Sequence, residues 1–179
     1  MSHPYTVVNM VATAKLGEFF DLIDISDDLD IYYAPEQFPG MSIKITNPKV
    51  CVNLFRSGQA VATGAKTFDD VNSAFEQVRS MLEKGGYEPF SEITPSLSNV
   101  VITHNMGQEL NLANLTIALP MARTEWEPEQ FPGLIFRLED LPSVCLIFSS
   151  GKCVITGSNS LEEAEQAVEA LREELLAVL

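Results

Sequence analysis

The stretch that decides the fold occurs twice in the chain. Residues 33–64, Tyr-Ala-Pro-Glu-Gln-Phe-Pro-Gly-Met through Val-Ala-Thr-Gly, return at residues 126–157 as Trp-Glu-Pro-Glu-Gln-Phe-Pro-Gly-Leu through Val-Ile-Thr-Gly. At a constant offset of 93 residues the copies agree at 12 of 32 positions: six in Pro-Glu-Gln-Phe-Pro-Gly, three in Phe-x-Ser-Gly and three in Val-x-Thr-Gly. A repeat this long is half a domain rather than one unit of a solenoid. We therefore expect two similar lobes about an approximate two-fold axis, a first repeat at residues 1–90 and a second at 91–179.

Length and charge narrow the class of protein. A chain of 179 residues fits one domain, or two fused lobes that share a sheet. It has 11 Lys and Arg against 25 Asp and Glu, a formal charge of −14, which taken alone argues against binding of nucleic acid by a basic surface. Cys51, Cys145 and Cys153 form no CxxC pair, so reduced thiols in a cytoplasmic protein are expected. No apolar run reaches the 18 or more residues of a membrane span.

The order of predicted elements is strand, helix, several strands, helix, taken twice, with four strands between the helices in the first repeat and three in the second. Alternating and helical apolar patterns, with turn signals between them, set the boundaries. Thr67 and Ser160 are the expected N-caps of the two long helices. The first repeat is predicted as a strand at 5–14, a helix at 16–29, strands at 31–33, 41–46, 50–55 and 59–63, and a helix from Thr67 to Gly85-Gly86. A connection at 87–98 follows. The second repeat is predicted as a strand at 100–103, a helix or irregular equivalent at 110–119, strands at 134–138, 144–148 and 152–156, and a final helix.

The strand at 144–148 is apolar on both faces. Alternate residues of a strand point to opposite sides, so Cys145 and Ile147 can face the helices while Val144, Leu146 and Phe148 face away. An antiparallel sheet covered by helices on one side normally presents a polar second face to water. An apolar second face therefore predicts a partner, either a ligand with a hydrophobic surface or a second copy of the chain.

The repeated motifs resemble the TATA-box-binding protein family in its archaeal form. Glu-Gln-Phe-Pro-Gly-Leu-Ile-Phe-Arg, Cys-Leu-Ile-Phe-Ser-Ser-Gly-Lys-Cys-Val-Ile-Thr-Gly and Val-Val-Asn-Met-Val-Ala-Thr carry the resemblance, which covers nearly the whole chain. It implies an α+β saddle of two pseudo-symmetric repeats, with a continuous antiparallel sheet of about ten strands and helices on the convex face. The function it implies is that of a general transcription initiation factor that binds and bends the minor groove of promoter DNA.

Site residues follow from the resemblance, position by position. Four phenylalanines would wedge into base steps, two asparagines would donate to base acceptors, and threonines, aliphatic residues and a few cations would line the rest. The implied DNA-binding residues are Asn9, Val11, Phe38, Lys44, Phe55, Val61, Thr63, Asn99, Val101, Phe131, Arg137, Val144, Leu146, Phe148, Lys152, Val154 and Thr156. Most acidic residues fall in the helices, which the resemblance places away from DNA, so the negative charge is compatible with this function.

The resemblance also implies partners. The loop with Glu127, Glu129 and Gln130 would contact a TFIIB-like factor and so recruit an RNA polymerase pre-initiation complex, in the nucleoid of a prokaryotic-type cell. Without DNA, the concave face could pair two copies of the chain. No metal, cofactor or catalytic residue is expected, because no Cys-His, Ser-His-Asp or phosphate-loop spacing is present. His3 and His104 belong to no motif and are expected on the surface.

The first repeat departs from the family pattern at three positions. Asn53 stands where the second repeat has Leu146, Gln59 where it has Lys152, and Arg56 follows Phe55 where a small residue is usual. These changes leave two other hypotheses open. One is a divergent paralogue that uses the saddle to bind protein, with weakened DNA binding; the other, more remote, is an enzyme that uses Cys51 on the open face.

Overall fold

The computed structural model describes residues 3–179, which form helices and antiparallel strands. The order of elements follows the sequence prediction except that residues 31–33 form no strand and that a 3₁₀ turn and β6 are added after α3. In chain order they are β1 (Thr6–Lys15), α1 (Leu22–Leu29), β2 (Met41–Ile45), β3 (Val50–Leu54), β4 (Gln59–Ala65), α2 (Phe68–Lys84), β5 (Ser96–Asn105), α3 (Leu112–Ala118), a 3₁₀ turn (Met121–Arg123), β6 (Thr124–Glu125), β7 (Leu134–Arg137), β8 (Val144–Ile147), β9 (Lys152–Ser158) and α4 (Leu161–Leu176).

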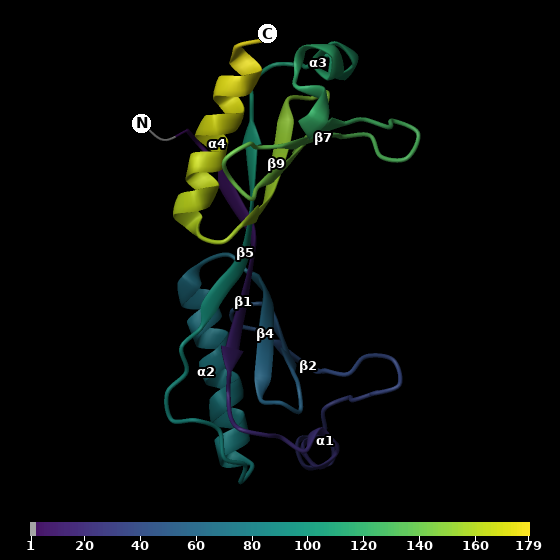
Figure 1. The fold of residues 1–179 in the computed structure, drawn as a ribbon. Helices are drawn as coiled ribbons and strands as arrows, with labels where there is room; N and C mark the ends of the chain where they lie inside the picture. Colours follow the sequence, from purple (N-terminus) through teal and green to yellow (C-terminus); the bar gives the residue numbers. More distant parts are fainter. Residues whose placement is uncertain (1–2) are drawn as a thin grey trace. The chain divides into compact units, whose positions relative to one another are not determined.

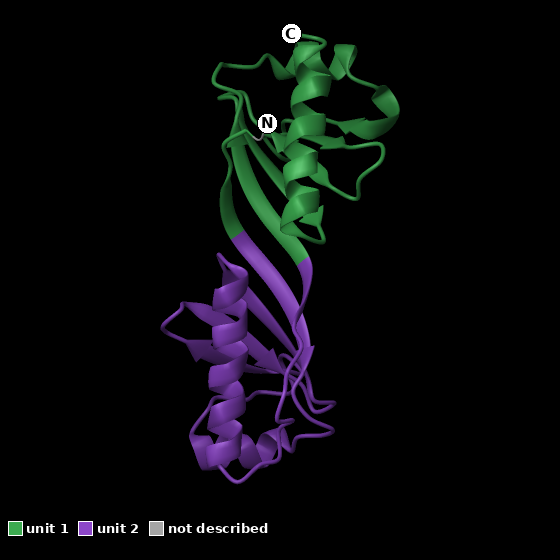
Figure 2. Ribbon diagram, turned by 90° about the vertical axis from the view of Figure 1, so that its left-hand side faces the viewer, with its two compact units in different colours: residues 1–8, 99–179 green, residues 9–98 purple. Residues whose placement is uncertain are grey.

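The chain divides into two compact units, coloured separately in Figure 2. Unit 2 is Asn9–Ser98, and unit 1 is the chain up to Val8 together with Asn99–Leu179. Unit 2 has the strand order β2-β3-β4-β1 and includes most of β1, and unit 1 has the order β5-β9-β8-β7-β6 and includes most of β5. All the registers within the units are antiparallel. Within each unit the long helix lies along one side of the strands, α2 in unit 2 and α4 in unit 1 (Figure 1). The predicted α+β fold class is confirmed.

Strict alternation of side chains separates the two faces of each sheet. In β2, Met41, Ile43 and Ile45 are buried, and the residues between them are exposed. In β8, Cys145 and Ile147 are fully buried, while the alternate residues are half-buried. Because successive side chains of a strand point to opposite sides, the buried set packs under the long helix. We call the side of the strands that points away from α2 or α4 the open face of each unit.

The long helices begin where the sequence predicts. The Thr67 hydroxyl accepts a hydrogen bond from Asp70 N–H at 3.0 Å, and the Ser160 hydroxyl accepts from Glu163 N–H at 3.1 Å. Each cap satisfies an amide that has no partner inside the helix, and the acidic side chains of the first turn interact favourably with the helix dipole. The predicted N-caps are confirmed.

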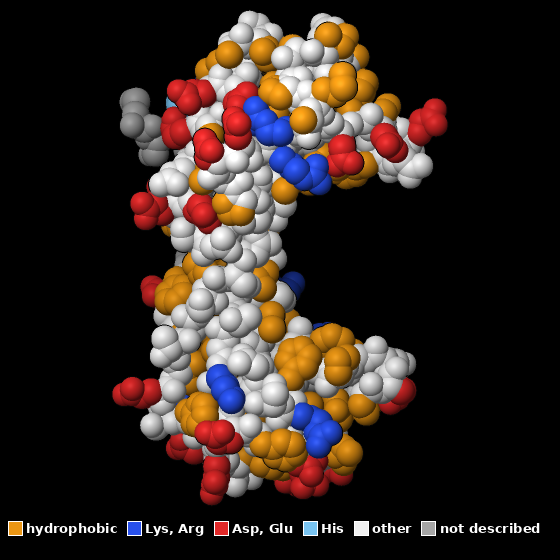
Figure 3. All heavy atoms as spheres, viewed as in Figure 1, with side chains coloured by type: hydrophobic (Ala, Val, Ile, Leu, Met, Phe, Trp, Pro, Cys, Tyr) orange, Lys and Arg blue, Asp and Glu red, His pale blue; other side chains and the backbone are white. Residues whose placement is uncertain are grey.

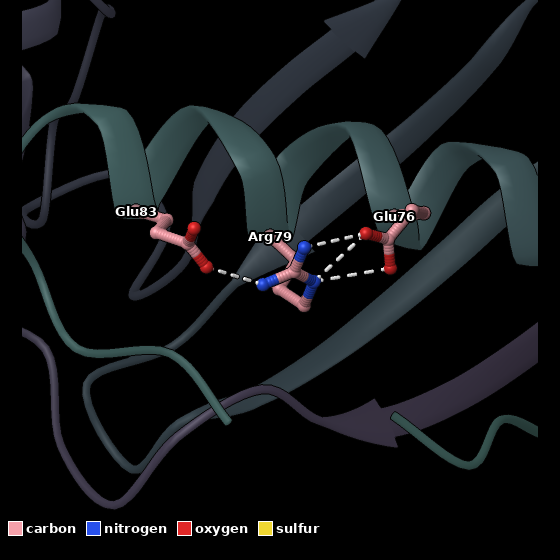
Figure 4. A network of polar contacts seen from close by, with 3 residues as sticks. All are labelled: Glu76, Arg79 and Glu83. Atoms are coloured by element: carbon pink, nitrogen blue, oxygen red, sulfur yellow. Dashed lines mark hydrogen bonds and ion pairs between the residues drawn. The ribbon is translucent and has the colours of Figure 1, made fainter. Parts of the chain in front are cut away.

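The solvent side of α2 carries a three-residue ion network (Figure 4). Arg79 lies between Glu76 and Glu83, with nitrogen–oxygen distances of 2.6 Å to each. These spacings of three and four residues place the three side chains on one stripe of the helix. The hydrogen bonds from Arg79 lower the pKa of Glu76 below its ordinary value, while desolvation of this carboxylate works weakly in the other direction.

The short first helix begins later than predicted. The prediction was residues 16–29, but α1 starts only after Asp21, whose carboxylate caps it through Ile23 N–H. The preceding residues bond elsewhere: Leu16 N–H donates to Gly58 O at 2.7 Å, and Phe20 N–H donates to Arg56 O at 3.0 Å. Their apolar side chains follow a helical spacing, but these tertiary hydrogen bonds hold the backbone in an irregular path.

The predicted strand at 31–33 is wrong, because these residues form no strand in the structure. Its counterpart in unit 1, β6, pairs with β7 and is held by an ion pair between Arg137 and Glu125 at 2.9 Å. In unit 2, Tyr32 and Lys44 occupy the equivalent positions, so this ion pair cannot form, and Tyr32 is 77% exposed. The strand β5 also begins at Ser96, inside the predicted connection.

His104 is another correction. It was expected on the surface, but its side chain is buried and joins three segments of unit 1. Its Nδ1 lies 2.7 Å from Pro4 O, and its Nε2 lies 3.0 Å from an Arg172 nitrogen on α4.

Within the described residues, no helix is long and apolar enough to cross a membrane.

Candidate nucleic-acid interface

The open face of unit 1 carries a row of aliphatic side chains across three strands. Ile135 on β7 lies opposite Leu146 on β8, and Leu146 lies opposite Val154 on β9. Val144 and Val101 point to the same side, and all five residues are half-buried. These half-buried side chains form the apolar second face that the sequence predicts for the strand at 144–148.

The equivalent row in unit 2 is largely polar. Ser42 on β2 lies opposite Asn53 on β3, and Asn53 lies opposite Val61 on β4. The Ser42 hydroxyl donates a hydrogen bond to Asn53 Oδ1 at 2.7 Å. Val61 and Val11 are half-buried as expected. The substitution of Asn53 seen in the sequence is therefore half of a polar pair, and its second member, Ser42, was not singled out beforehand.

Each unit places its two predicted wedge phenylalanines in contact. The rings of Phe38 and Phe55 meet edge to face with centroids 5.8 Å apart and an interplanar angle of 65°, and those of Phe131 and Phe148 do so at 5.8 Å and 67°. Edge-to-face contact is a favourable arrangement for aromatic rings. Phe38 is 42% exposed and Phe131 is 36% exposed, which is unusual for such large apolar side chains.

A glycine makes room for each aromatic pair. A Cβ atom added at Gly40 would lie 2.8 Å from the Phe38 ring and 2.9 Å from the Phe55 ring. At Gly133 the distances would be 2.7 Å to Phe131 and 3.1 Å to Phe148. The Phe-Pro-Gly motif thus includes the residue that lets both rings rest against the backbone. Neither glycine was predicted as a site residue, although its repetition beside the phenylalanine is visible in the sequence.

The predicted asparagine donors are held in one orientation. Asn9 Oδ1 accepts from Gly64 N–H at 2.7 Å, and Asn99 Oδ1 accepts from Gly157 N–H at 2.8 Å. Both glycines have positive φ, +98° and +91°, and lie where the strand register shifts, so their amides leave the regular ladder. Because the carboxamide oxygen is engaged, the NH₂ group of each asparagine is the end that can donate to a ligand; that of Asn99 also lies 3.3 Å from Thr156 Oγ1.

A second row on each open face runs from a cation to a threonine. Its members are Lys44, Cys51 and Thr63 in unit 2 and Arg137, Val144 and Thr156 in unit 1. Both cations are exposed, as is Lys152 at the start of β9. Lys152 is the third predicted cation and lies opposite Asn105 on β5. Arg137 is the one that also makes an ion pair, with Glu125, and both partners are more than half exposed.

The loop before Phe131 presents its three predicted partner residues to solvent. Glu127, Glu129 and Gln130 are all exposed, and Figure 3 shows acidic side chains at the tip of this loop, between β6 and β7. The amides of Gln130 and Phe131 donate to Glu127 O at 2.9 and 3.0 Å, which fixes a tight turn. In unit 2 the same turn is built on the carbonyl of Ala34, so the backbone is alike and a carboxylate is missing.

The two buried cysteines, Cys145 and Cys153, do not have the environment of a nucleophile. Burial raises the pKa of the Cys153 thiol to about 11 and, with Cys153 nearby, raises the pKa of Cys145 still further. A thiol with a raised pKa holds little of the reactive thiolate at neutral pH. Cys51 is half-exposed, and its sulfur lies 3.8 Å from Asn53 Oδ1.

Between residues 3 and 179, no group of three or more His, Cys, Asp or Glu side chains is placed to hold a metal ion.

Together these features define a class of protein in which the open face of an antiparallel sheet is apolar and aromatic rather than basic. Comparisons with known proteins identify the family. The model of the family described as Transcription factor TFIID (or TATA-binding protein, TBP) matches residues 4–85 and 94–178. The chain is 42% identical to the TATA-box-binding protein of Archaeoglobus fulgidus over 170 residues, which are 94% of this chain and 93% of that protein.

Two further relatives agree with this result. The TATA-box-binding protein B of Halobacterium salinarum is 41% identical over 94% of this chain and 91% of its own length. The solved structure of Methanococcus jannaschii TBP superposes with a TM-score of 0.89 at 37% identity, covering 98% of this chain and all of that chain. The chain belongs to the TATA-binding protein family. The resemblance drawn from the sequence is confirmed, and so is the expectation of a non-enzymatic protein, since the family is one of DNA-binding transcription factors.

Proposed function

We propose that this chain is a general transcription initiation factor that binds the minor groove of TATA elements in core promoters with the open faces of its two units. The duplicated aromatic pair carries this proposal: two large rings, partly exposed and seated on a glycine, occur in the same geometry in each unit. A structural core would not expose them twice in the same way. We also propose that the two functional repeats are those of the sequence, residues 1–90 and 91–179.

The phenylalanines would act as wedges. Minor-groove proteins, of which this family is itself a usual example, insert apolar side chains between base steps and bend the duplex. Unstacking costs a few kcal/mol per step and is offset by the protein surface that the bent duplex then covers. The half-buried aliphatic residues around each pair, such as Leu146 and Val61, supply that surface.

The asparagines would read the edges of the bases. In the minor groove, A·T pairs in either orientation present only acceptors, adenine N3 and thymine O2. Asn9 and Asn99 offer donors there, because their oxygens are held by backbone amides of the protein. Lys44, Arg137 and Lys152 would contact phosphates, which position a protein on DNA without reading its sequence.

The exposed loop of unit 1 would recruit the next factor. Glu127, Glu129 and Gln130 form an acidic, hydrogen-bonding surface that suits a basic region of a TFIIB-like protein, and through it an RNA polymerase pre-initiation complex. In unit 2 Ala34 replaces the first of these carboxylates, so the two loops differ electrostatically. A partner that requires both carboxylates would bind on one side and give the complex its direction, in the nucleoid of a prokaryotic-type cell.

A binding and bending experiment tests the proposal. A gel shift compares a TATA duplex with a scrambled duplex of the same base composition, and dyes at the two duplex ends report the bend. We expect at least tenfold preference for the TATA duplex and a bend that falls when Phe131 and Phe148 are both replaced by Ala. Equal binding of both duplexes without bending would overturn the proposal and favour the protein-binding paralogue.

The same apolar surface would pair two copies of the chain when DNA is absent. Each open face presents half-buried aliphatic and aromatic side chains, and water-exposed apolar patches of this kind favour association. Light scattering on the free protein and on its TATA complex checks this: we expect a dimer that becomes one chain per duplex. A monomer at all concentrations would rule the dimer out without affecting the DNA-binding proposal.

A further inference from the structure

The polar pair on β2 and β3 of unit 2 has no counterpart in unit 1. Ser42 and Asn53 point away from α2, because their strand neighbours Ile43, Val52 and Leu54 are buried beneath it. Ser42 is exposed and Asn53 is half-buried, so both are available to a ligand on the open face. The equivalent cross-strand pair in unit 1 is aliphatic.

The hydrogen bond within the pair decides which groups remain free. Ser42 Oγ donates its proton to Asn53 Oδ1 at 2.7 Å. The serine oxygen therefore keeps its lone pairs, whereas Asn53 Oδ1 accepts from Ser42 and also from the Cys51 thiol at 3.8 Å, so both of its lone pairs are engaged. Among residues 3–179 we find no hydrogen bond from Asn53 Nδ2, which leaves it as a donor. The pair thus offers the serine lone pairs as acceptors and one amide as a donor, where unit 1 presents aliphatic side chains.

Minor-groove chemistry gives these acceptors a use. A·T pairs present only acceptors in the minor groove, whereas a G·C pair adds one donor, the guanine N2 amino group. An aliphatic row pressed against guanine would bury this amino group without a partner, which is costly. A surface with free acceptors would satisfy it.

We infer that Ser42 and Asn53 form an acceptor site for the guanine N2 amino group, so that unit 2 accepts a G·C pair where unit 1 requires A·T. The inference rests on the proposed minor-groove binding and adds which base pairs each unit accepts. The two residues are specificity-determining: Ser42 Oγ, which Asn53 holds by a hydrogen bond, would accept from the amino group, and Asn53 Nδ2 would donate to the N3 or O2 acceptor beside it. The promoter element recognised would then be degenerate in one half.

The experiment uses inosine, which is guanine without the N2 amino group. One duplex carries an element of A·T pairs only, and one is scrambled. A series moves a single G·C pair through every position of the element, and a matched series has I·C in its place. Dissociation constants are measured for the parent chain and for the double variant Ser42→Ile, Asn53→Leu, which copies the chemistry of Ile135 and Leu146.

For the parent we expect at least one position where the G·C and I·C duplexes bind within twofold of each other. At that position the double variant should bind G·C about tenfold more weakly than I·C, the effect of one unsatisfied hydrogen-bonding group. Its affinity for the A·T duplex should be equal or higher, which also shows that it is folded. The control Ile135→Val, Leu146→Ile should keep the parent's ratio.

Two outcomes would overturn the inference alone. One is a parent that prefers I·C over G·C by about tenfold at every position, and the other is a double variant that keeps the parent's ratio throughout. In both cases the A·T duplex would still be preferred to the scrambled one, and the proposed function would stand. A parent that binds the A·T and scrambled duplexes equally would overturn the proposed function, and the inference with it.

Discussion

The open faces of the two units share their scaffold and differ in what they display. Both carry a phenylalanine pair on a glycine, and both hold an asparagine against a glycine amide. The row beside these features is Ile135, Leu146 and Val154 in unit 1, but Ser42, Asn53 and Val61 in unit 2. Residues that shape the backbone or seat the rings are thus duplicated, while two of the three positions in this row have diverged. Under the proposed function, the comparison separates residues that both units need for binding from residues that set specificity.

The largest expected effect is the loss of a wedge. Phe148→Ala should weaken TATA binding by about 2–3 kcal/mol, because a large aromatic surface is no longer buried in the groove. Phe55→Ala should cost less, because its neighbours Ser42 and Asn53 give weaker apolar support than Ile135 and Leu146. Affinity and bend angle are measured together on end-labelled duplexes. Reduced bending with equal loss of affinity would keep the wedges and refute the asymmetry; parent-like bending in both variants would refute the wedges.

The acidic loops give the next contrast. Charge reversal at Glu127 and Glu129 should weaken ternary complex formation with a TFIIB-like factor at least tenfold, because both carboxylates lie on the exposed turn. Glu36→Lys, at the position in unit 2 that matches Glu129, is the control and should leave the ternary complex intact. A band-shift titration with the factor, at saturating duplex, checks both. Equal loss of duplex binding and ternary binding would mean that the loop contacts DNA instead.

Filling the space under the rings should have a moderate effect. Gly133→Ala places a methyl group 2.7 Å from the Phe131 ring, so the exposed ring must move, at a cost of about 1–2 kcal/mol in TATA binding. Gly40→Ala should displace Phe38 in the same way. It should weaken TATA binding less than Gly133→Ala, for the same reason that Phe55→Ala should weaken it less than Phe148→Ala. Unfolding temperatures provide the control: both variants should unfold close to the parent because the displaced rings are partly exposed. A large fall in unfolding temperature would mean that these rings belong to the core.

The cations of the two units should differ in their salt dependence. Arg137→Ala should make the slope of log K against log salt shallower by about one unit, the loss of one phosphate contact. Glu125→Gln should raise affinity slightly, because the exposed ion pair to Arg137 competes weakly with phosphate. Lys44 has no such competitor at the equivalent of Glu125, which is Tyr32. An unchanged slope for Arg137→Ala would mean that this side chain meets no phosphate, and that Glu125 is irrelevant to binding.

The smallest effect concerns the helix side. Arg79 lowers the pKa of Glu76, so the stability from this pair is present above the ordinary glutamate pKa and is lost as pH falls through the lowered value. Glu76→Gln should lower the unfolding temperature by about 1 °C at pH 7, a small effect because Glu76 is exposed and its charge is screened, and this loss should shrink as pH falls through the lowered pKa. Glu173→Gln near the carboxyl end of α4 should be neutral or stabilising, because a negative charge is unfavourable there. A loss at pH 3 as large as at pH 7 would exclude the ion pair as the cause.

The sequence alone was sufficient for the repeat, the family and most of the element order. These follow from local patterns: Phe-Pro-Gly and Thr-Gly recur at a constant offset, strand residues alternate, and Thr67 and Ser160 mark the helix starts. The wedge and amide residues could be proposed by position from the family resemblance, because the motifs that carry it occur in both repeats. Nothing in the sequence showed that Asn53 has Ser42 as a partner, because these residues meet only through the register of β2 and β3.

What only the tertiary structure decided depends on contacts between segments far apart in the chain. The irregular path of Leu16 to Phe20 is set by carbonyls of Gly58 and Arg56, and no local propensity encodes those hydrogen bonds. His104 is buried because Pro4 and Arg172 meet it from opposite ends of the chain. Apolar periodicity and turn residues are properties of neighbouring positions and can be read directly. Pairing of polar groups, the room for a ring above a glycine and the choice between strand and coil at 31–33 depend on distant residues, and appear only when the chain is folded.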